Sequence, residues 1–456
     1  MESNKLKIVP ILKIAICILF FNSTVANAQQ LTLRKAYELM LENNGEIKAS
    51  SFDVKSMEEE QKATKGLRLP TVSVSGTYLN LDKDISANLN TERDMVGGLL
   101  GIPDPASILG DWNFSLLDKN VGFASADITM PLYAGGKINA ANKASKIKLD
   151  LSENKHQLKE DDLTINLITS FYRLKLAQEA ENLRKEVYET VLLHSKQADK
   201  FFENGIIPEV ETLNAKVALS NANRELLAAK KDVELATTAL KNLIGIDSLE
   251  TISIALNSPS ILKPVDQFQD QMLKENIQLK TIENNKQLAK VGVQVENSDY
   301  FPKVGVFGKY LFWKDNLPLA STKWLAGISL EWELFNGFQR EHKIKAAKHK
   351  VSQLEALDKQ ARLNLTTYTK KLYNEIEKQL EQIKSLKTDE TFAKKLKFMR
   401  TRAFEEGTGT SLEVVDATLK LNEIKLHKIK ALYLYNIAYG ELMVRIGETE
   451  SFLNEN

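Results

Sequence analysis

Four stretches of the chain alternate between apolar and polar side chains, and this period of two predicts β-strands with two different faces. They cover about residues 71–81, 121–133, 303–313 and 323–335. The second stretch would place Ala124, Ala126, Ile128, Met130 and Leu132 on one face and Ser125, Asp127 and Thr129 on the other. A tilted strand that crosses a membrane needs about 9–11 residues, so these lengths and faces are typical of an outer-membrane barrel.

Aromatic side chains lie near both ends of the predicted strands. We expect two groups at the membrane interfaces, Tyr310, Trp313 and Trp324 at one end and Tyr133, Trp332 and Phe335 at the other. The alternative is a four-stranded sheet on a soluble core. The alternation of lysine and glutamate with tryptophan in the fourth stretch argues against that alternative.

Outside the strands the apolar period is that of a helix. Residues 138–202 contain neither proline nor glycine, and about 65 helical residues would extend roughly 100 Å. A second long helix is predicted over about 338–404, and a shorter one over about 32–66. The return helix after the first long one has a heptad-like apolar seam, which indicates packing along other helices: Ala215, Ala218, Ala222, Leu226, Ala229, Val233, Ala236, Leu240 and Leu243.

The second half of the chain repeats the first, in the order helix, strand, strand, long helix, turn and helix. The turns at Gly205 and Gly407 lie 202 residues apart, and so do Phe202 and Phe404. Such matching turns indicate an internal duplication. The first strand-to-strand connection, about 82–120, is much longer than the second, and we expect a surface loop or a small lid there.

The repeats divide the chain into a signal peptide (1–28), a first repeat (29–246) with its tip at about 203–209, a linker (247–264), a second repeat (265–447) with its tip at about 405–411, and a C-terminal tail (448–456). The signal peptide is indicated by early lysines, an apolar run at 14–21 and a cleavage site at Ala26-Asn27-Ala28. An N-terminal membrane anchor is the alternative, but the run is shorter than the ~20 residues of a span.

Composition and motifs exclude several classes of protein. The 61 basic residues are balanced by 60 acidic ones, so the basic excess of a nucleic-acid binder is missing. The only cysteine, Cys17, lies inside the predicted signal peptide, too early for lipid attachment, and the mature chain forms no disulfide. No phosphate-binding loop or nucleophile elbow is present. The histidines fall in helical stretches without a third metal ligand nearby: His156, His194, His342, His349 and His427. We therefore expect no enzyme activity, cofactor or metal.

Four strands cannot close a membrane barrel by themselves. The smallest known barrels have about eight strands, and an open edge in lipid would leave backbone groups unpaired. We therefore expect the barrel to be shared between copies in a cyclic homo-oligomer. Three copies would supply twelve strands.

In the order and spacing of these elements, the chain resembles the TolC-like outer-membrane factor family over essentially its whole mature length. The resemblance is carried by residues 31–36 with Glu42-Asn43-Asn44, the strand-to-helix segments 131–137 and 334–337, and both tips. It implies a mainly α fold with a membrane β-barrel portion. The assembly would be a homotrimer with a twelve-stranded barrel in the outer membrane of a Gram-negative bacterium and a twelve-helix periplasmic tunnel.

The resemblance also implies a function. The trimer would be a passive exit duct for drug efflux or type I secretion. Its partners would be a periplasmic adaptor (membrane fusion) protein and an inner-membrane transporter of the RND or ABC type. The tips would contact the adaptor through Gly205, Ile206, Ile207 and Pro208 and through Gly407, Thr408, Gly409 and Thr410.

An acidic ring narrows the tunnel's inner end in this family, at positions that match Glu413 and Asp416. Their i, i+3 spacing puts both carboxylates on one helix face, where a ring of copies would favour cations. The alternative is an ordinary helix start, where acidic residues suit the helix dipole. The first tip keeps Glu211 but has Asn214 in place of the aspartate. We therefore expect the second hairpin to line the entrance and the first to flank it.

Two positions depart from the family pattern. The second tip turn has no basic residue, whereas family members often have one that helps hold the entrance closed, so different closing contacts are expected. Gly45 follows the paired asparagines in place of a proline, with no expected consequence.

Two other classes of protein are alternatives to an outer-membrane duct. A periplasmic adaptor has one hairpin and no lipid-facing strands, and a structural coiled-coil protein needs no two-faced strands.

Overall fold

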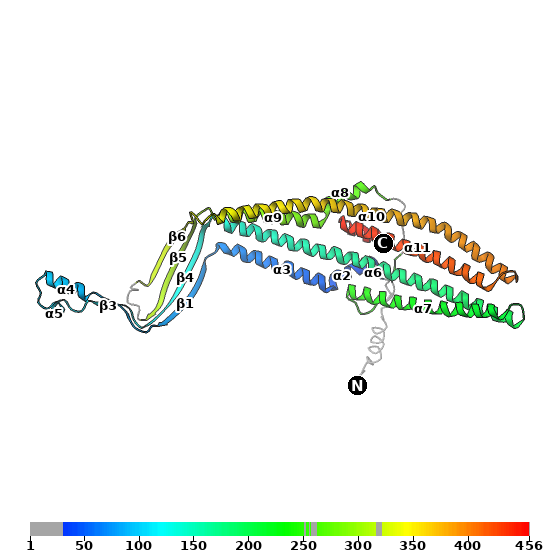
Figure 1. Cartoon of the computed structure of the whole chain (residues 1–456), viewed down its shortest axis with the longest axis horizontal. Helices are drawn as coiled ribbons and strands as arrows, with labels where there is room; N and C mark the ends of the chain where they lie inside the picture. Colours follow the sequence, from blue (N-terminus) through cyan, green and yellow to red (C-terminus); the bar gives the residue numbers. More distant parts are fainter. Residues whose placement is uncertain (1–30, 250–251, 255, 257–261, 316–321, 456) are drawn as a thin grey trace, which may run out of the picture. The chain divides into compact units, whose positions relative to one another are not determined.

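The computed structural model describes residues 31–249, 252–254, 256, 262–315 and 322–455 (Figure 1). The predicted signal peptide and part of the predicted linker lie outside these residues. The chain divides into two compact units, which we call the hairpin unit and the sheet unit. The hairpin unit comprises Met1–Phe52, Asn154–Lys280 and Lys359–Asn456, and the sheet unit comprises Asp53–Glu153 and Thr281–Asp358.

The sheet unit is built on four antiparallel strands in the order β1-β4-β5-β6. These strands, which lie side by side in Figure 1, are β1 (Thr71–Asn80), β4 (Asn120–Ala134), β5 (Lys303–Asp315) and β6 (Trp324–Glu331). On one face, Lys309 Nζ lies 3.2 Å from Asp127 Oδ1, and Ser125 Oγ donates to Asp127 at 2.8 Å. The other face exposes apolar side chains, including Ile328 and Leu330. The alternation in the sequence therefore becomes a sheet with one polar and one apolar face.

The fourth strand is shorter than the alternation predicts. The predicted range is 323–335, but β6 ends at Glu331. Beyond it, the Arg340 guanidinium donates to the carbonyls of Glu333 and Leu334 at 3.2 and 3.4 Å. The ladder ends here because Glu331 pairs with Lys303, the first residue of β5, and the preceding Pro302 has no N–H to donate, while the apolar alternation in the sequence continues.

The long connection between β1 and β4 has secondary structure of its own. β2 (Ile85–Asn88) pairs with β3 (Asn113–Leu117), and two helices lie between them, α4 (Asn90–Leu99) and α5 (Pro105–Leu109). The helices meet closely, since a Cβ at Gly97 would lie 2.3 Å from Pro105 Cγ. The surface loop or lid predicted for about 82–120 is thus a folded insert, drawn beyond the end of the sheet in Figure 1.

At the opposite end of the sheet, every strand connects to a helix. β1 follows α3 (Gly45–Lys65) and the short η1 (Gly66–Arg68), and β5 follows α9 (Ile277–Ser298). β4 leads into α6 (Lys137–Glu203) and β6 into α10 (Gln339–Glu405). In the sheet unit α6 and α9 pack through a small apolar cluster of Ala140, Ile147 and Val291.

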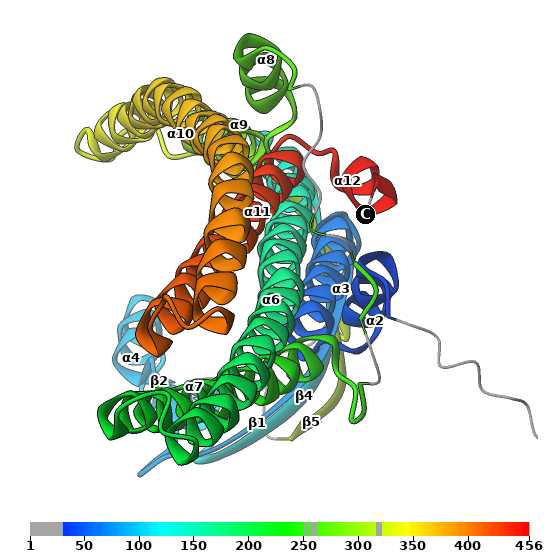
Figure 2. The same ribbon diagram turned by 90° about the vertical axis from the view of Figure 1, so that its right-hand side faces the viewer.

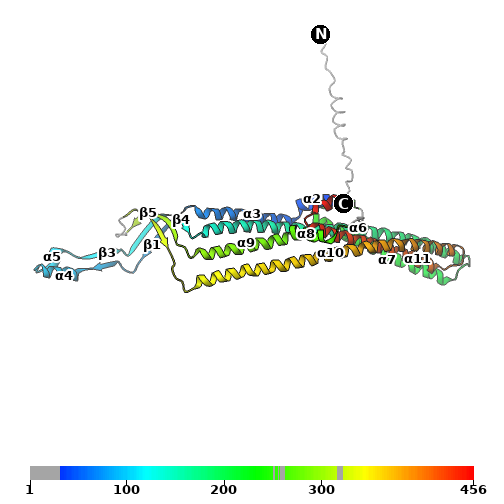
Figure 3. The same cartoon turned by 90° about the horizontal axis from the view of Figure 1, so that it is seen from above.

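The hairpin unit contains two antiparallel helical hairpins. α6 returns as α7 (Glu209–Ile244), and α10 returns as α11 (Ser411–Arg445). Each helix pair runs side by side in Figure 1, Figure 3 shows the same helices from above, and Figure 2 views the two hairpin ends. The predicted seam of α7 is buried at Ala215, Ala222, Leu226, Ala229, Ala236 and Leu240.

The predicted helix at 32–66 is interrupted at Asn44, between α2 (Leu33–Asn43) and α3. Asn44 has extended backbone; its Oδ1 accepts from Glu46 N at 2.9 Å, and its Nδ2 donates to Leu243 O at 2.9 Å. Asn276 does the same in the second repeat, accepting from Gln278 N and donating to Arg445 O. Each asparagine therefore starts one helix and binds the end of the returning helix.

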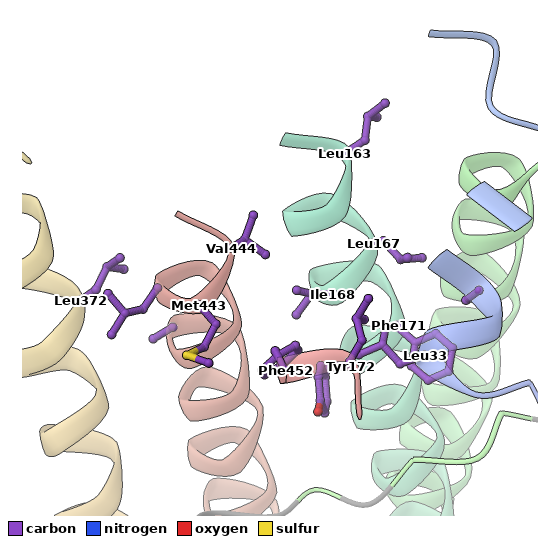
Figure 4. Close-up of a cluster of buried hydrophobic side chains, with 14 of the residues drawn as sticks. Leu33, Leu163, Leu167, Ile168, Phe171, Tyr172, Leu372, Met443, Val444 and Phe452 are labelled. Atoms are coloured by element: carbon purple, nitrogen blue, oxygen red, sulfur yellow. The ribbon is translucent and has the colours of Figure 1, made fainter. Parts of the chain in front are cut away.

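The main apolar core of the hairpin unit lies beside these breaks. Figure 4 shows Leu33, Phe171, Tyr172, Met443 and Phe452 among its buried side chains. α2, α8 (Val265–Glu275), α6, α10 and α11 all contribute residues. The predicted C-terminal tail also belongs to this core, because α12 (Thr449–Glu455) buries Phe452 and Leu453.

None of the helices in the described part of the chain has a stretch long and apolar enough to span a membrane.

Candidate functional site

The two hairpin tips have the same backbone turn. Gly205 and Gly407 have φ of 71° and 76°, in the left-handed region that glycine adopts without strain. Gly205 N donates to Phe202 O at 2.8 Å, and Gly407 N donates to Phe404 O at 3.0 Å. The repeat that the sequence indicates at this point is therefore a repeat of backbone geometry.

The second tip starts its return helix with a reciprocal capping box. Glu413 N donates to Thr410 Oγ1 at 3.3 Å, and Thr410 N donates to Glu413 Oε2 at 3.2 Å. These bonds satisfy two N–H groups that a helix N-terminus leaves without partners. Gly409 makes the tight approach possible, because a Cβ there would lie 3.1 Å from Ala403 Cβ.

Glu413 also forms an ion pair that the sequence analysis missed. Arg400 Nη1, on α10, donates to Glu413 Oε1 at 2.8 Å. The turn itself contains no basic residue, as the sequence indicates. The basic partner of Glu413 is Arg400, which lies nearly two helical turns before the turn. One carboxylate oxygen of Glu413 thus accepts from the backbone at the start of α11, and the other accepts from Arg400. Glu413 therefore has the role of an ordinary acidic residue at a helix start, in addition to any role at the entrance.

Asp416 is placed differently. It is exposed, and in the described part of the chain no basic group lies within 4.0 Å of its carboxylate. It borders a groove of about 390 Å³ between α6 and α11 that also carries charges of both signs, from Arg184, Lys420 and Glu423. The two predicted carboxylates lie on the same helix, one turn apart. Of the two, only Asp416 has no ion-pair partner among the described residues.

The first tip lacks these polar contacts. Pro208 occupies the N-cap of α7, where its side chain cannot accept a hydrogen bond. Ile206 is exposed and Ile207 half-buried. Glu211 Oε2 is buried and has no hydrogen-bond partner among the described residues. Most of the predicted adaptor-contact residues of both tips are exposed, which leaves their backbone and side chains accessible.

A buried histidine joins the two hairpins near the tips, and the sequence analysis assigned it no role. His194 Nε2, on α6, and Ser411 Oγ, at the start of α11, are 2.8 Å apart and share a hydrogen bond. The rings of His194 and Phe404 pack edge to face with their centroids 4.5 Å apart, and the ring centroids of Phe404 and Phe201 are 5.4 Å apart. This cluster ties the first hairpin to the start of the second return helix.

Burial lowers the pKa of His194, while Ser411 and the charge of Glu211 act in the opposite direction. The ring is therefore neutral at pH 7. A signal for its burial exists in the sequence, because His194 continues the spacing of buried Val187, Val191 and Ala198 on one face of α6.

The six aromatic residues predicted at membrane interfaces lie at the two ends of the sheet. Tyr310 pairs with Trp324 at the end near the insert, where Trp313 pairs with Ala124. At the helix end, Trp332 Nε1 donates to Tyr300 O at 3.1 Å, and Tyr133 and Phe335 are exposed.

Across the described residues, no group of histidine, cysteine or carboxylate side chains is arranged to hold a metal.

A family model described as outer membrane efflux protein matches residues 36–246 and 269–448. CyaE of Bordetella pertussis is 25% identical over 240 residues, which cover 51% of this chain and 51% of CyaE. The alkaline protease secretion protein AprF of Pseudomonas aeruginosa is 21% identical over 308 residues, which cover 65% of this chain and 64% of AprF. The matches thus span about half to two thirds of these relatives. The structure of the outer-membrane channel OprN superposes with a TM-score of 0.73 at 16% identity, over 91% of this chain and 90% of that chain.

Proposed function

The chain belongs to the outer membrane efflux protein family, and from that premise we propose that it is the outer-membrane exit duct of a tripartite efflux or type I secretion system. Substrates would pass from a periplasmic adaptor and an inner-membrane transporter of the RND or ABC type to the exterior. The duct itself is passive and carries out no catalysis. We place it in the outer membrane of a Gram-negative bacterium, after removal of an N-terminal signal peptide.

The observation that carries this proposal is the sheet with two open edges. Within the described residues, β1 and β6 each pair on one side only, and the apolar face of the sheet is exposed. Open edges in lipid would leave N–H and C=O groups without partners. Pairing β1 of one copy with β6 of the next closes the sheet, and three copies give a twelve-stranded barrel.

The same arrangement accounts for the two helical hairpins. Each copy contributes two hairpins, α6–α7 and α10–α11, and three copies would give the walls of a periplasmic tunnel. The tips then form its inner end. Their exposed turns, Gly205–Pro208 and Gly407–Thr410, are the surface that we assign to the adaptor.

We assign the charge at the entrance chiefly to Asp416. A trimer would bring together six carboxylates, from Glu413 and Asp416, and such a ring favours cations. Arg400 offsets the charge of Glu413 through the 2.8 Å ion pair, whereas Asp416 has no such partner among the described residues. Asn214 holds the matching place in the first hairpin, so that hairpin would add no charge there.

The proposal is tested by fractionation and by the mass of the purified protein. The mature chain should be found in outer membranes and should have the mass of a trimer in mild detergent. A soluble periplasmic monomer would contradict the proposal and favour the adaptor or coiled-coil alternatives. Co-purification then separates the two systems, because a drug-efflux duct would retain a different class of transporter from a protein-secretion duct.

A further inference from the structure

The two ends of the sheet carry opposite charge. The loop end holds the insert, and residues 81–120 contain seven acidic and three basic side chains. The helix end is where β1 begins at Thr71, β4 ends at Ala134, β5 begins at Lys303 and β6 ends at Glu331. The helices that start there are basic.

Both long helices begin with a run of lysines. Residues 137–149, the start of α6, contain four lysines and no acidic residue. Residues 340–350, the start of α10, contain Arg340 and four lysines against one acidic residue, Glu341. We call the exposed lysines of these runs the basic belt: Lys143, Lys146 and Lys148 on α6, and Lys343, Lys345, Lys348 and Lys350 on α10.

Within the described residues, no ion pair neutralises the lysines of the basic belt. In the part of the chain that the structure describes, none of these seven lysines has a carboxylate within 4.0 Å, although lysines elsewhere on the same helices do. Lys394, for example, lies 2.7 Å from Glu390. Exposed like charges close together repel unless an anion binds them. The belt therefore has unsatisfied positive charge at one level of the fold.

An apolar band lies directly beside the belt. Trp332, Phe335 and Phe338 are exposed between the end of β6 and the start of α10. Tyr300 is exposed as well, with the Arg340 guanidinium 3.9 Å from its ring centre. Aromatic rings followed by cationic side chains are typical of the level at which a protein passes from hydrocarbon to lipid headgroups. The band gives the belt a definite depth relative to a membrane.

We propose that the basic belt docks onto the anionic headgroups of phospholipids, such as phosphatidylglycerol, in the membrane leaflet on the helix side of the sheet. The proposal rests on the proposed function only in placing the sheet in a membrane. Juxtamembrane lysines attract anionic lipid electrostatically, and the attraction falls off within a Debye length. At 1.5 Å per residue, the belt lysines of α10 begin roughly 8 Å along the chain from Phe338, within that range, whereas Lys371 lies roughly 50 Å from it.

The test compares lipids that remain bound to the full-length mature protein, purified as its native oligomer in a neutral detergent. Phosphatidylglycerol and phosphatidylcholine are supplied in equal amounts, and the retained lipids are counted by native mass spectrometry. The belt variant is Lys343→Gln/Lys345→Gln/Lys348→Gln/Lys350→Gln. The matched control is Lys371→Gln/Lys384→Gln/Lys387→Gln/Lys395→Gln, which removes the same charge from exposed positions farther along α10.

We expect wild type to retain phosphatidylglycerol over phosphatidylcholine by at least about tenfold, with the preference reduced at high salt. The belt variant should lose most of that preference and the control should keep it. Equal retention of both lipids by wild type, or an equal loss in both variants, would overturn the proposal. Binding to peptidoglycan without any lipid preference would overturn it too, in favour of a cell-wall surface.

Pore conductance is a separate readout. A protein that discriminates the lipids but forms no conducting pore would contradict the proposed duct and leave the lipid surface intact. A conducting pore without lipid preference would contradict the proposed lipid surface and leave the proposed duct intact. Circular dichroism and oligomer mass verify that both lysine variants are folded.

Discussion

The two hairpin tips share a turn and differ in almost every side chain around it. Both turn at a glycine with positive φ, and both bond that glycine to the phenylalanine three residues earlier. The second tip adds a capping box, an ion pair to Arg400 and a buried Phe404, whereas the first has Pro208 and an exposed Phe202. The duplicated backbone thus fixes where the chain turns back, and the side chains of each copy determine what the turn does.

The largest expected difference concerns the matched phenylalanines. Phe404 is 3% exposed and packs on His194 and Phe201, while Phe202 is 42% exposed. Phe404→Ala should lower the free energy of opening the second tip by about 3–5 kcal/mol, and Phe202→Ala should lower that of the first by under about 0.5 kcal/mol. Hydrogen exchange of the first turns of α7 and α11 measures both. Equal loosening of the two tips would remove the distinction between them.

A smaller difference is expected at the helix caps. Thr410→Ala removes the side-chain half of the capping box and should destabilise the start of α11 by about 1 kcal/mol. Pro208→Ala removes no side-chain hydrogen bond from the start of α7 and should change its stability little. The amide exchange of Glu413 reports the first effect directly. An unprotected Glu413 amide in wild type would contradict the capping box.

The hydrogen bond between His194 and Ser411 should make the second tip sensitive to pH. Burial lowers the folded-state pKa of His194 below its ordinary value of 6.5, so the unfolded or opened state binds the proton more readily. The contribution to stability is fully present above about pH 6.5 and is lost as pH falls through that value toward the lower folded pKa. The protection factors of the amides at the start of α11 should therefore fall on acidification, after correction for the slower intrinsic exchange at lower pH.

The matched control for this pH effect is His194→Gln, which keeps a hydrogen-bonding group but does not titrate. The pH dependence should disappear in that variant. Its persistence would assign the effect to other groups, such as Glu211, whose charge acts on His194.

Among the variants of the second tip, the smallest stability effect is expected for Arg400→Gln. Its ion pair with Glu413 is partly exposed on both sides, so its loss should cost under about 1 kcal/mol. The charge effect should be clearer, because Glu413 is then no longer offset and the entrance gains negative charge. Cation preference of the pore should rise. An unchanged cation preference would mean that Glu413 does not face the conduction path.

Much of the fold follows from two periods in the sequence. The period of two places the four strands, and the absence of proline and glycine over 138–202 predicts the first long helix; both patterns are local, so they can be read without knowledge of contacts. The positions that deviate depend on contacts between distant residues. β6 ends at Glu331 because its partner Lys303 is the first residue of β5, and Asn44 breaks a helix by binding Leu243. A short segment of sequence contains only one member of each pair, so neither contact can be predicted from local patterns.

In the candidate site too, some features can be predicted from local sequence and others depend on contacts between distant residues. The glycine turns are recognisable from the 202-residue repeat, whereas the two carboxylates of the second tip are assigned to the entrance through the family resemblance. The partners of those residues are not, because Arg400 reaches Glu413 across the turn and His194 reaches Ser411 over 217 residues of sequence. The insert between β1 and β4 was missed for another reason, since its helices of ten and five residues are too short to produce a clear period.

The acidic entrance is tested most directly by the ion selectivity of the reconstituted protein in planar bilayers. We expect a pore that prefers cations and is blocked by multivalent cations from the side of the tips. Replacing Glu413 and Asp416 by alanine should largely abolish both properties, and Asn214→Ala, at the matching place in the first hairpin, should leave them unchanged. A double variant with unaltered reversal potential and unaltered block would contradict the assignment of the entrance to the second tip.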